Sequence, residues 1–385
     1  GMYSDAIQQI IYWLKKALEH AENEQQEKWL NMLIRYYETG NLEEFNNYNI
    51  AWLQDTESQA DLINGFIETY SDPLGLKGTW ESILHVKDTE ATKRTNSLSK
   101  HAQWFEDNAP IEDRFKKSEV KGISANVVNV AMLGGESHPT SPIGVNLPNS
   151  DWIRKEYGSK SITLNNVTKA HHDAMLQSGF IEEFASSQEE IDRHKKYGFI
   201  ADNLHTDLHE CLGHGSGKMM DGVYSEALKN YQAPIEEARA DLFALYFMMD
   251  QKLVELEIIP TLEVAKSQYD SYIRNGLFTQ LIKVKPGKHL EQAHMRNRQL
   301  IALWCYENGL NENIIELKKN QGKSYFIIHD YHKLRLLFAR LLAEIQRIKS
   351  EGDYNAAKSL VENYGTQINT KLHQEVINRF SKLDI

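Results

Sequence analysis

The sequence predicts a mainly α-helical fold with a small β component. Apolar residues recur at helical spacing through the first forty residues and again through most of the chain beyond Thr168. Between these regions, residues 122–167 contain short runs of β type and a loop rich in Gly, Pro and Ser. With 385 residues, the chain is long enough for one large or two medium domains around a sizeable core.

The N-terminal region predicts helices followed by a break. Residues 3–37 carry an apolar stripe at helical spacing, and Gly40 is a suitable stop signal. Residues 64–81, NGFIETYSDPLGLKGTWE, then introduce Pro and Gly, which predicts an irregular connection.

The middle of the chain predicts a small sheet, and the remainder predicts helices. Three runs in the middle have strand character: NVVNVAM, IGVNL and SITLNNV. The later helical segments are 188–214, 234–257, 262–282, 288–307 and 330–383. No repeat of 20–50 residues is present, which argues against a solenoid.

Composition excludes several classes of partner. A net charge of -11 does not suit a nucleic-acid partner, because binding to phosphates needs a concentrated basic face. No run of eighteen apolar residues is present, so we expect no membrane partner. Cys211 and Cys305 are the two cysteines of the sequence, which favours a reducing, cytoplasmic location.

The stretch HECLGH at 209–214 contains two histidines five residues apart. In a regular helix, positions five apart differ by about 140° around the axis and about 7.5 Å along it. Two nitrogens bound to one zinc ion lie about 3.4 Å apart, since each is about 2.0 to 2.1 Å from the ion. We therefore expect the helix to absorb one extra residue, as a π-bulge or an unwound turn, and Gly213 tolerates such a backbone well.

A third ligand is expected downstream, because catalytic zinc sites commonly take three protein ligands. Residues 234–250, PIEEARADLFALYFMMD, predict an apolar helix with Glu236, Glu237 and Asp241 in its first turns. Glu237 and Asp241, four apart, share one face, so one can bind the metal while the other accepts the free ring N–H of a ligand histidine.

Each of these residues also has a purely structural interpretation. The two histidines could be surface or capping residues near a glycine-rich helix end, and the acids could favour a helix N-terminus. His205 precedes His209 by four residues and could form a competing pair, but Thr206 follows it where a catalytic base would be needed.

HECLGH followed by EEARAD resembles the zinc peptidases of the dipeptidyl peptidase III family, whose motifs are HExxGH and EExRxD/E. The resemblance implies that His209, His214 and Glu237 bind one Zn²⁺ ion and that Glu210 is the general base. Glu236 and Asp241 are then expected to contact the metal-binding residues on the side away from the metal ion.

Three more segments resemble this family, in the family's order. ExYxDPxG matches Glu68, Tyr70, Asp72, Pro73 and Gly75; GxNxPN matches Gly144, Asn146, Pro148 and Asn149; AHMxxR matches His294 and Arg298. The resemblance implies that Glu68 holds the substrate's N-terminal amine and that Tyr70 and His294 contact the reacting carbonyl. Gly144, Asn146, Asn149 and Arg298 are implied to bind substrate. Individually, Tyr70 and Pro73 could be turn or core residues, and His294 an ordinary helix histidine.

The resemblance also implies an architecture. We expect the helix-rich zinc catalytic lobe of a two-lobed metallopeptidase over residues 121–385, and a helical remnant of the other lobe over residues 2–120. Family members are longer, so we expect this chain to be the catalytic portion of a longer bacterial protein whose missing N-terminal lobe is a potential partner.

The expected function is release of dipeptides from the N-terminus of short peptides by metal-activated water, with Glu210 as base and His294 and Tyr70 donating hydrogen bonds. Two alternatives stay open: a zinc-binding but inactive fragment, and a noncatalytic peptide-binding module.

Overall fold

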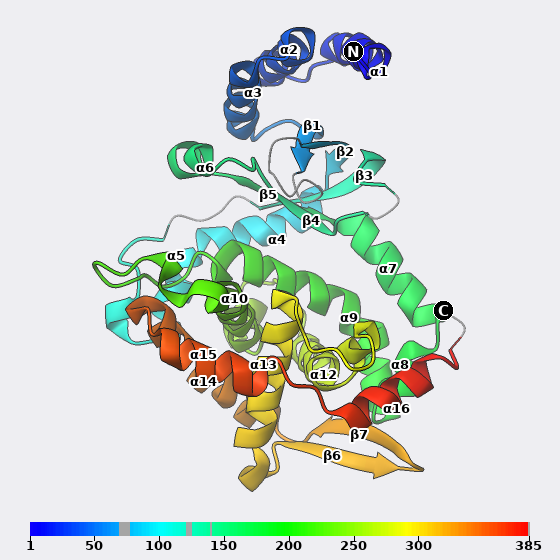
Figure 1. Cartoon of the computed structure of the whole chain (residues 1–385), viewed down its shortest axis with the longest axis vertical. Coiled ribbons are helices and arrows are strands. Elements are labelled where there is room, and N and C mark those ends of the chain that lie inside the picture. The colour runs from blue at the N-terminus through cyan, green and yellow to red at the C-terminus, as the bar shows by residue number, and fades with distance from the viewer. Residues whose placement is uncertain (69–77, 121–124, 139–140, 384–385) are drawn as a thin grey trace. The chain divides into compact units, whose positions relative to one another are not determined.

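Figure 1 shows the computed structural model, which describes residues 1–68, 78–120, 125–138 and 141–383. It is mainly helical with small sheets, which confirms the predicted fold class. The chain divides into two compact units: unit 1 comprises Gly1–Lys93 and Ser124–Thr168, and unit 2 comprises Arg94–Ile123 and Lys169–Ile385. The units interleave along the chain, whereas the sequence suggests a single boundary near residue 120, because strands beyond that point complete the sheet of unit 1.

Unit 1 begins with three helices, α1 (Ser4–Leu18), α2 (Glu24–Thr39) and α3 (Leu42–Gln54). A break at residues 19–23 divides the region that the apolar spacing predicts as helical. The side chain of Asn23 caps α2 by accepting a hydrogen bond from Gln26 N at 2.9 Å. Gly40 ends α2 in the left-handed conformation, with φ of 68°, as the sequence predicts.

A five-stranded sheet completes unit 1 within the described residues. Its strands lie in the order β1 (Ala60–Glu68), β2 (Thr79–Lys87), β3 (Ala125–Gly135), β5 (Lys160–Leu164) and β4 (Gly144–Leu147). β3 and β5 are parallel and the other pairs are antiparallel. α6 (Asp151–Tyr157) links β4 to β5. The predicted small sheet is present, and it also includes β1 and β2. These strands contain residues 64–68 and 79–81, so the prediction of an irregular connection is wrong at both ends of the stretch 64–81.

The core of unit 1 lies between the helices and this sheet. Trp29 and Leu33 of α2 and Trp52 of α3 are buried against Ile83 and Ile162 of the strands. The apolar side chains that alternate along the strands therefore pack against these helices.

Unit 2 is built around α10 (Gln232–Met248). α10 packs against α9 (Gln188–Leu208), α12 (Glu263–Leu277), α13 (Ala293–Asn308) and α14 (Tyr331–Glu351), as Figure 1 shows. Its sequence is apolar around most of its circumference, which is typical of a helix buried on all sides.

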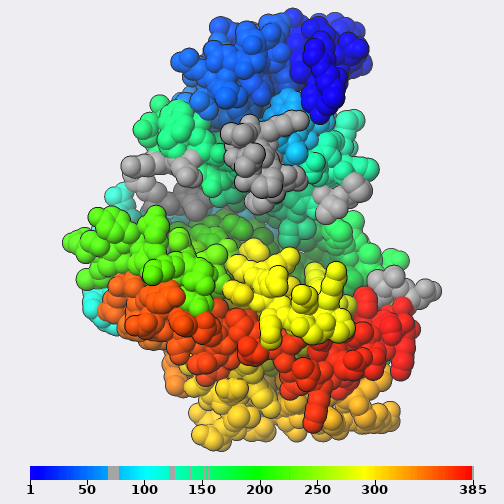
Figure 2. All heavy atoms as spheres, in the orientation of Figure 1, coloured from blue at the N-terminus to red at the C-terminus, as the bar shows by residue number. Residues whose placement is uncertain are grey.

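Shorter elements surround these helices. They are α5 (Ala102–Asp107), η1 (Asp113–Phe115), α8 (Phe180–Phe184), η3 (Ser225–Tyr231), α11 (Gln251–Glu255), η4 (Thr279–Lys283), η5 (Leu310–Glu312), α15 (Tyr354–Tyr364) and α16 (Thr370–Phe380). α4 (Thr89–Lys100) and α7 (Asn165–Gln177) each contain a boundary between the units. In Figure 2 the orange and red C-terminal helices lie beside the yellow segment near residue 290, where Leu290 N donates to Thr366 O at 3.4 Å.

A hairpin of β6 (Ile315–Asn320) and β7 (Lys323–Ile328) interrupts the helices of unit 2. Gln321 and Gly322 form its two-residue turn, with φ of 50° and 80°. Two positive φ values match the twist of the strands, but glutamine is an unusual first residue for such a turn. This explains why the sequence gives no clear hairpin signal here.

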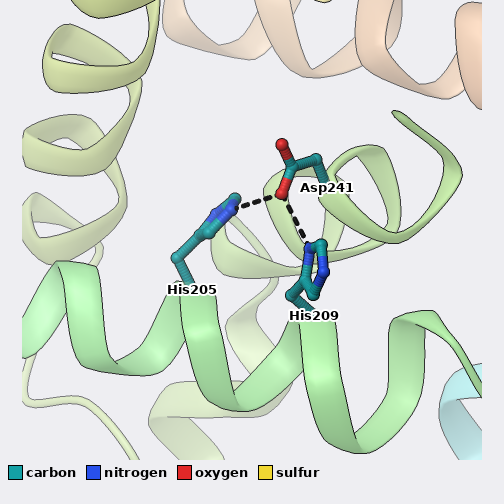
Figure 3. Close-up of side chains that lie close together, drawn as sticks. All are labelled: His205, His209 and Asp241. Atoms are coloured by element: carbon teal, nitrogen blue, oxygen red, sulfur yellow. Dashed lines mark hydrogen bonds and ion pairs between the residues drawn. The ribbon is translucent and has the colours of Figure 1, made fainter. Parts of the chain in front are cut away.

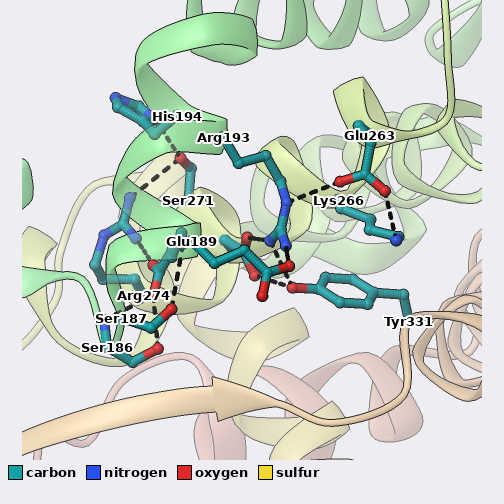
Figure 4. Close-up of polar contacts among 12 residues, drawn as sticks. Ser186, Ser187, Glu189, Arg193, His194, Glu263, Lys266, Ser271, Arg274 and Tyr331 are labelled. Atoms are coloured by element: carbon teal, nitrogen blue, oxygen red, sulfur yellow. Dashed lines mark hydrogen bonds and ion pairs between the residues drawn. The ribbon is translucent and has the colours of Figure 1, made fainter.

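Buried arginines tie α9 to α12 and α14 (Figure 4). Arg193 donates to Asp270 at 2.5 Å and to Glu263 at 3.1 Å, and Tyr331 donates to the other oxygen of Asp270 at 2.7 Å. Arg274 donates to Glu190. Burial, together with the charge of Glu190, raises the pKa of Asp270 to about 7.

Candidate metal centre

α9 continues directly into a π-helical turn, η2 (His209–Gly213). The backbone N–H of His214 donates to the carbonyl of His209, five residues earlier, at 3.0 Å. This turn absorbs the extra residue that the five-residue spacing requires. The two imidazole rings consequently lie together, with centroids 4.6 Å apart and planes at 89°.

Gly213 allows this turn to approach α10 closely. A Cβ atom at Gly213 would lie 2.9 Å from both the Cα and the carbonyl oxygen of Ala240. Gly213 does not have a positive φ. The residue is therefore required by close helix contact, and not by the unusual backbone that the sequence argument invokes.

Three side chains converge at this turn. His209, His214 and Glu237 each offer one ligand atom, and these atoms lie within 4.8 Å of one another. Oε2 of Glu237 is 3.3 Å from Nε2 of His209 and 4.0 Å from Nε2 of His214. This oxygen is buried without a hydrogen-bond partner in the described part of the chain, and an orphaned buried carboxylate oxygen is costly unless a cation satisfies it. Two imidazoles and one carboxylate are a donor set that fits zinc.

A further carboxylate of α10 contacts each histidine at Nδ1, the ring nitrogen that does not face Glu237. Nδ1 of His209 lies 2.8 Å from Oδ1 of Asp241, and Nδ1 of His214 lies 2.9 Å from Oε1 of Glu236. A carboxylate at Nδ1 fixes the proton there and leaves the lone pair of Nε2 facing Glu237. The tautomer that suits metal binding is thus built into the contacts.

Burial and these hydrogen bonds shift the pKa values of His209 and Asp241 in opposite directions. Burial lowers the pKa of His209, but the hydrogen bond to Asp241 and the contact with Glu237 outweigh it and raise this pKa to about 10. Burial raises the pKa of Asp241, but hydrogen bonds from His205 and His209 outweigh it and lower this pKa well below its usual value.

Two basic residues that the sequence reasoning missed hold Glu236. Arg239 is fully buried and donates to both oxygens of Glu236, at 2.6 and 3.0 Å, and to the carbonyls of His214 and Ser216. Lys349 of α14 donates to Glu236 at 2.6 Å. Arg239 could have been noticed as the arginine within EEARAD, whereas Lys349 is too distant in sequence to give a signal.

Asp241 also contacts a histidine outside the predicted site. Figure 3 shows its carboxylate between His205 and His209, and Nε2 of His205 lies 3.0 Å from Oδ1. The HxxxH spacing was visible in the sequence, but it suggested a competing metal pair and not a shared carboxylate.

The other predicted residues of unit 2 lie on the same turn or on α13. Glu210 is half-buried in η2, directly after His209. His294 lies in the first turn of α13, with Nδ1 3.4 Å from Oε2 of Glu237 and its side chain 68% exposed. Arg298 follows one helical turn later and is half-buried.

The remaining predicted residues belong to unit 1. Gly144 and Asn146 lie on β4, an edge strand, and Asn149 follows it and accepts a hydrogen bond from Arg154 at 3.0 Å. Glu68 ends β1, but the structure does not describe its side chain. Tyr70, Asp72, Pro73 and Gly75 lie outside the described residues.

The sequence matches known proteins over most of its length. The model of peptidase family M49 matches residues 1–226 and 221–380. Dipeptidyl peptidase 3 of Mus musculus is 24% identical over 94% of this chain and 54% of its own length. Dipeptidyl peptidase 3 of Dictyostelium discoideum is 27% identical over 80% of this chain and 49% of its own. The chain thus spans about half the length of these relatives.

A solved structure shares the fold. The structure of DPP III from Caldithrix abyssi superimposes with a TM-score of 0.82 at 22% sequence identity and covers 100% of this chain and 70% of that one. Among the residues that the structure describes, no helix is both long and apolar enough to cross a membrane.

Proposed function

The chain belongs to peptidase family M49, and on that premise we propose that it is a zinc-dependent exopeptidase that releases dipeptides from the N-terminus of short peptides. One observation carries the proposal: two imidazole nitrogens converge on a buried carboxylate oxygen that has no hydrogen-bond partner in the described structure. The names of the relatives, dipeptidyl peptidase 3, support the dipeptide as the product.

His209 and His214 would hold the zinc ion through Nε2, and Glu237 through Oε2. Imidazole ligands favour zinc over calcium or magnesium, which prefer oxygen donors. When bound, zinc would polarise the scissile carbonyl and lower the pKa of a water molecule. Asp241 and Glu236 would keep the two imidazoles in the tautomer that leaves Nε2 available.

Glu210 is proposed as the general base. It follows His209 directly on the π-helical turn, so its carboxylate can receive a proton from the attacking water and return it to the departing amine. His294, 3.4 Å from Glu237, and Tyr70 would donate hydrogen bonds to the negative charge that develops on the carbonyl oxygen.

Residues of unit 1 are proposed to bind the peptide backbone and its free amine. β4 pairs with β5 on one side, which supports addition of an extended peptide along its other edge at Gly144 and Asn146, where the carbonyl of Asn146 also accepts a hydrogen bond from Arg154 at 2.7 Å. Glu68 and Asn149 would hold the N-terminal amine and so set the cut two residues from the end. Arg298 is proposed to contact the substrate from α13. Short cytoplasmic peptides are the expected substrates.

Zinc analysis and hydrolysis of a dipeptidyl naphthylamide test this proposal on the wild-type chain and on Glu210→Gln. Zinc-dependent hydrolysis that the variant loses while keeping zinc would support it. Stoichiometric zinc without hydrolysis would indicate an inactive zinc-binding protein, and peptide affinity indifferent to Glu210 and zinc would indicate a binding module. Either result would overturn the proposal.

The product pattern tests the exopeptidase step separately. We expect mass spectrometry of a digested hexapeptide to show dipeptides, and the same peptide with an acetylated N-terminus to resist cleavage. Release of single residues, or equal cleavage of the acetylated peptide, would contradict the dipeptide assignment.

A further inference from the structure

The carboxylate of Asp241 is surrounded by donors on both oxygens. Oδ1 lies 2.8 Å from Nδ1 of His209 and 3.0 Å from Nε2 of His205. Oδ2 accepts from the hydroxyl of Tyr272 and from Nδ2 of Asn297, each at 2.7 Å. A carboxylate has about four acceptor positions, so these four contacts fill its capacity.

The side chain of His205 is directed to its contact with Oδ1 of Asp241. It lies one helical turn before His209 on α9, with its ring 6.3 Å from that of His209 and 5.7 Å from that of Tyr272. Its Nδ1 is buried and has no hydrogen-bond partner among the described residues. Since the ionised carboxylate only accepts, Nε2 of His205 must carry the proton, and within the described part of the chain Asp241 is the one hydrogen-bond partner of this side chain.

A second metal ion at His205, His209 and Asp241 does not fit these contacts, although the three ligand atoms lie within 4.8 Å of one another. His209 would need to use both ring nitrogens as ligands, and the oxygens of Asp241 are already occupied by donors. The hydrogen-bonded arrangement satisfies every acceptor position of the carboxylate, so the cluster is a hydrogen-bond network.

We propose that His205 is a positioning residue that fixes Oδ1 of Asp241 and thereby orients the metal-binding imidazole of His209. Tyr272 and Asn297 hold one oxygen of Asp241, and His205 holds the other beside Nδ1 of His209 (Figure 3). Without His205, the carboxylate can rotate away from the position that His209 requires. This inference rests on the proposed function, since it concerns the same metal centre.

Two substitutions separate positioning from packing. His205→Leu fills the space without a donor, whereas His205→Gln places an amide N–H near the position of Nε2. Zinc affinity, measured by competition with a chromophoric chelator, is expected to fall about 10- to 100-fold in His205→Leu and to be restored within about threefold in His205→Gln. Both variants are expected to melt at similar temperatures without metal. Equal zinc affinity in all three proteins would overturn the inference.

A double-mutant cycle tests whether His205 acts through Asp241. In an Asp241→Asn background, His205→Leu is expected to cause no further loss of zinc affinity, because the residue through which it acts is already altered. Independent, multiplicative losses would refute the proposed route. Two zinc ions per wild-type chain, reduced to one by His205→Leu, would instead establish a second metal site. If the wild-type chain bound no zinc, the proposed function itself would fail.

Discussion

Replacing Gly213 by alanine should damage the metal centre through a single added methyl group. The new Cβ would lie 2.9 Å from the Cα and the carbonyl oxygen of Ala240 and 3.1 Å from its Cβ. Two of these atoms are backbone of the buried helix α10, so a rotamer change cannot relieve the overlap. The π-helical turn or α10 must move. These elements carry His209 and Glu237, and His214 follows the turn directly.

The overlap sets the size of the effect. Overpacking of a well-packed interior by one methyl group costs about 1–3 kcal/mol. If the metal-free protein relaxes by displacing the turn, zinc binding must restore it, and 1–3 kcal/mol corresponds to an affinity loss of about 5- to 150-fold. If the turn cannot relax, the same energy appears as lower stability, at about 1–2 °C of melting temperature per kcal/mol for a chain of this length.

Zinc competition titrations and thermal melts of the metal-free protein together measure both outcomes. Gly215→Ala is the matched control, because a Cβ there would meet its nearest atom at an ordinary 3.5 Å and its φ is not positive. We expect this control to bind zinc and to melt like the wild type. The steric argument would be refuted if Gly213→Ala showed neither loss, or if Gly215→Ala were equally damaged.

Other contacts lead to further expected outcomes. Glu237→Ala should lower zinc affinity, and stoichiometric zinc retained at nanomolar free metal would contradict its role as a ligand. Asp241→Asn should lower zinc affinity or activity about 10- to 100-fold, and an unchanged variant would rule out its role behind His209. His294→Ala should reduce kcat about 100- to 1000-fold at full zinc occupancy, and a loss of zinc would reassign it to the ligand set. Because burial and the charge of Glu190 raise the pKa of Asp270 from 3.8 to about 7, its contribution to the free energy of unfolding should fall as pH rises from about 4 to 7. Asp270→Asn should flatten this part of the stability profile measured by urea unfolding, and an unchanged slope would show that Asp270 is not responsible.

Secondary structure was predictable where a local signal decided it. Gly40 ends a helix because a residue without Cβ adopts the left-handed cap at little cost, and α10 is recognisable from its apolar sequence. The break before Asn23 was missed because Trp29 falls at helical spacing from Leu18, although residues 19–28 between them contain no apolar residue except Ala21. The turn at Gln321 was missed because glutamine rarely adopts positive φ, and only pairing of the two strands explains it.

The residues of the candidate metal centre that belong to the two sequence motifs could be predicted, but the residues that surround them could not. Spacing alone required a distorted turn between His209 and His214, because two imidazoles five residues apart on a regular helix could not reach one ion. The outer contacts depend on tertiary packing. Lys349 and Tyr272 reach the centre from helices far along the chain, and nothing local in the sequence distinguishes them from other lysines and tyrosines.

The histidines of HECLGH and the acids of EEARAD match in their spacing as well as in their chemistry. His209 contacts Asp241 and His214 contacts Glu236, so the later histidine meets the earlier acid, as in two segments that run antiparallel. The histidines are five residues apart and so are these two acids, which places the acids about 7.5 Å apart along α10. A histidine spacing of four on a regular helix could still chelate a metal, but it would not keep both Nδ1 atoms opposite this pair of acids. The π-helical turn therefore matches the histidines to the carboxylates behind them, while Glu237, between those acids in sequence, faces the Nε2 atoms.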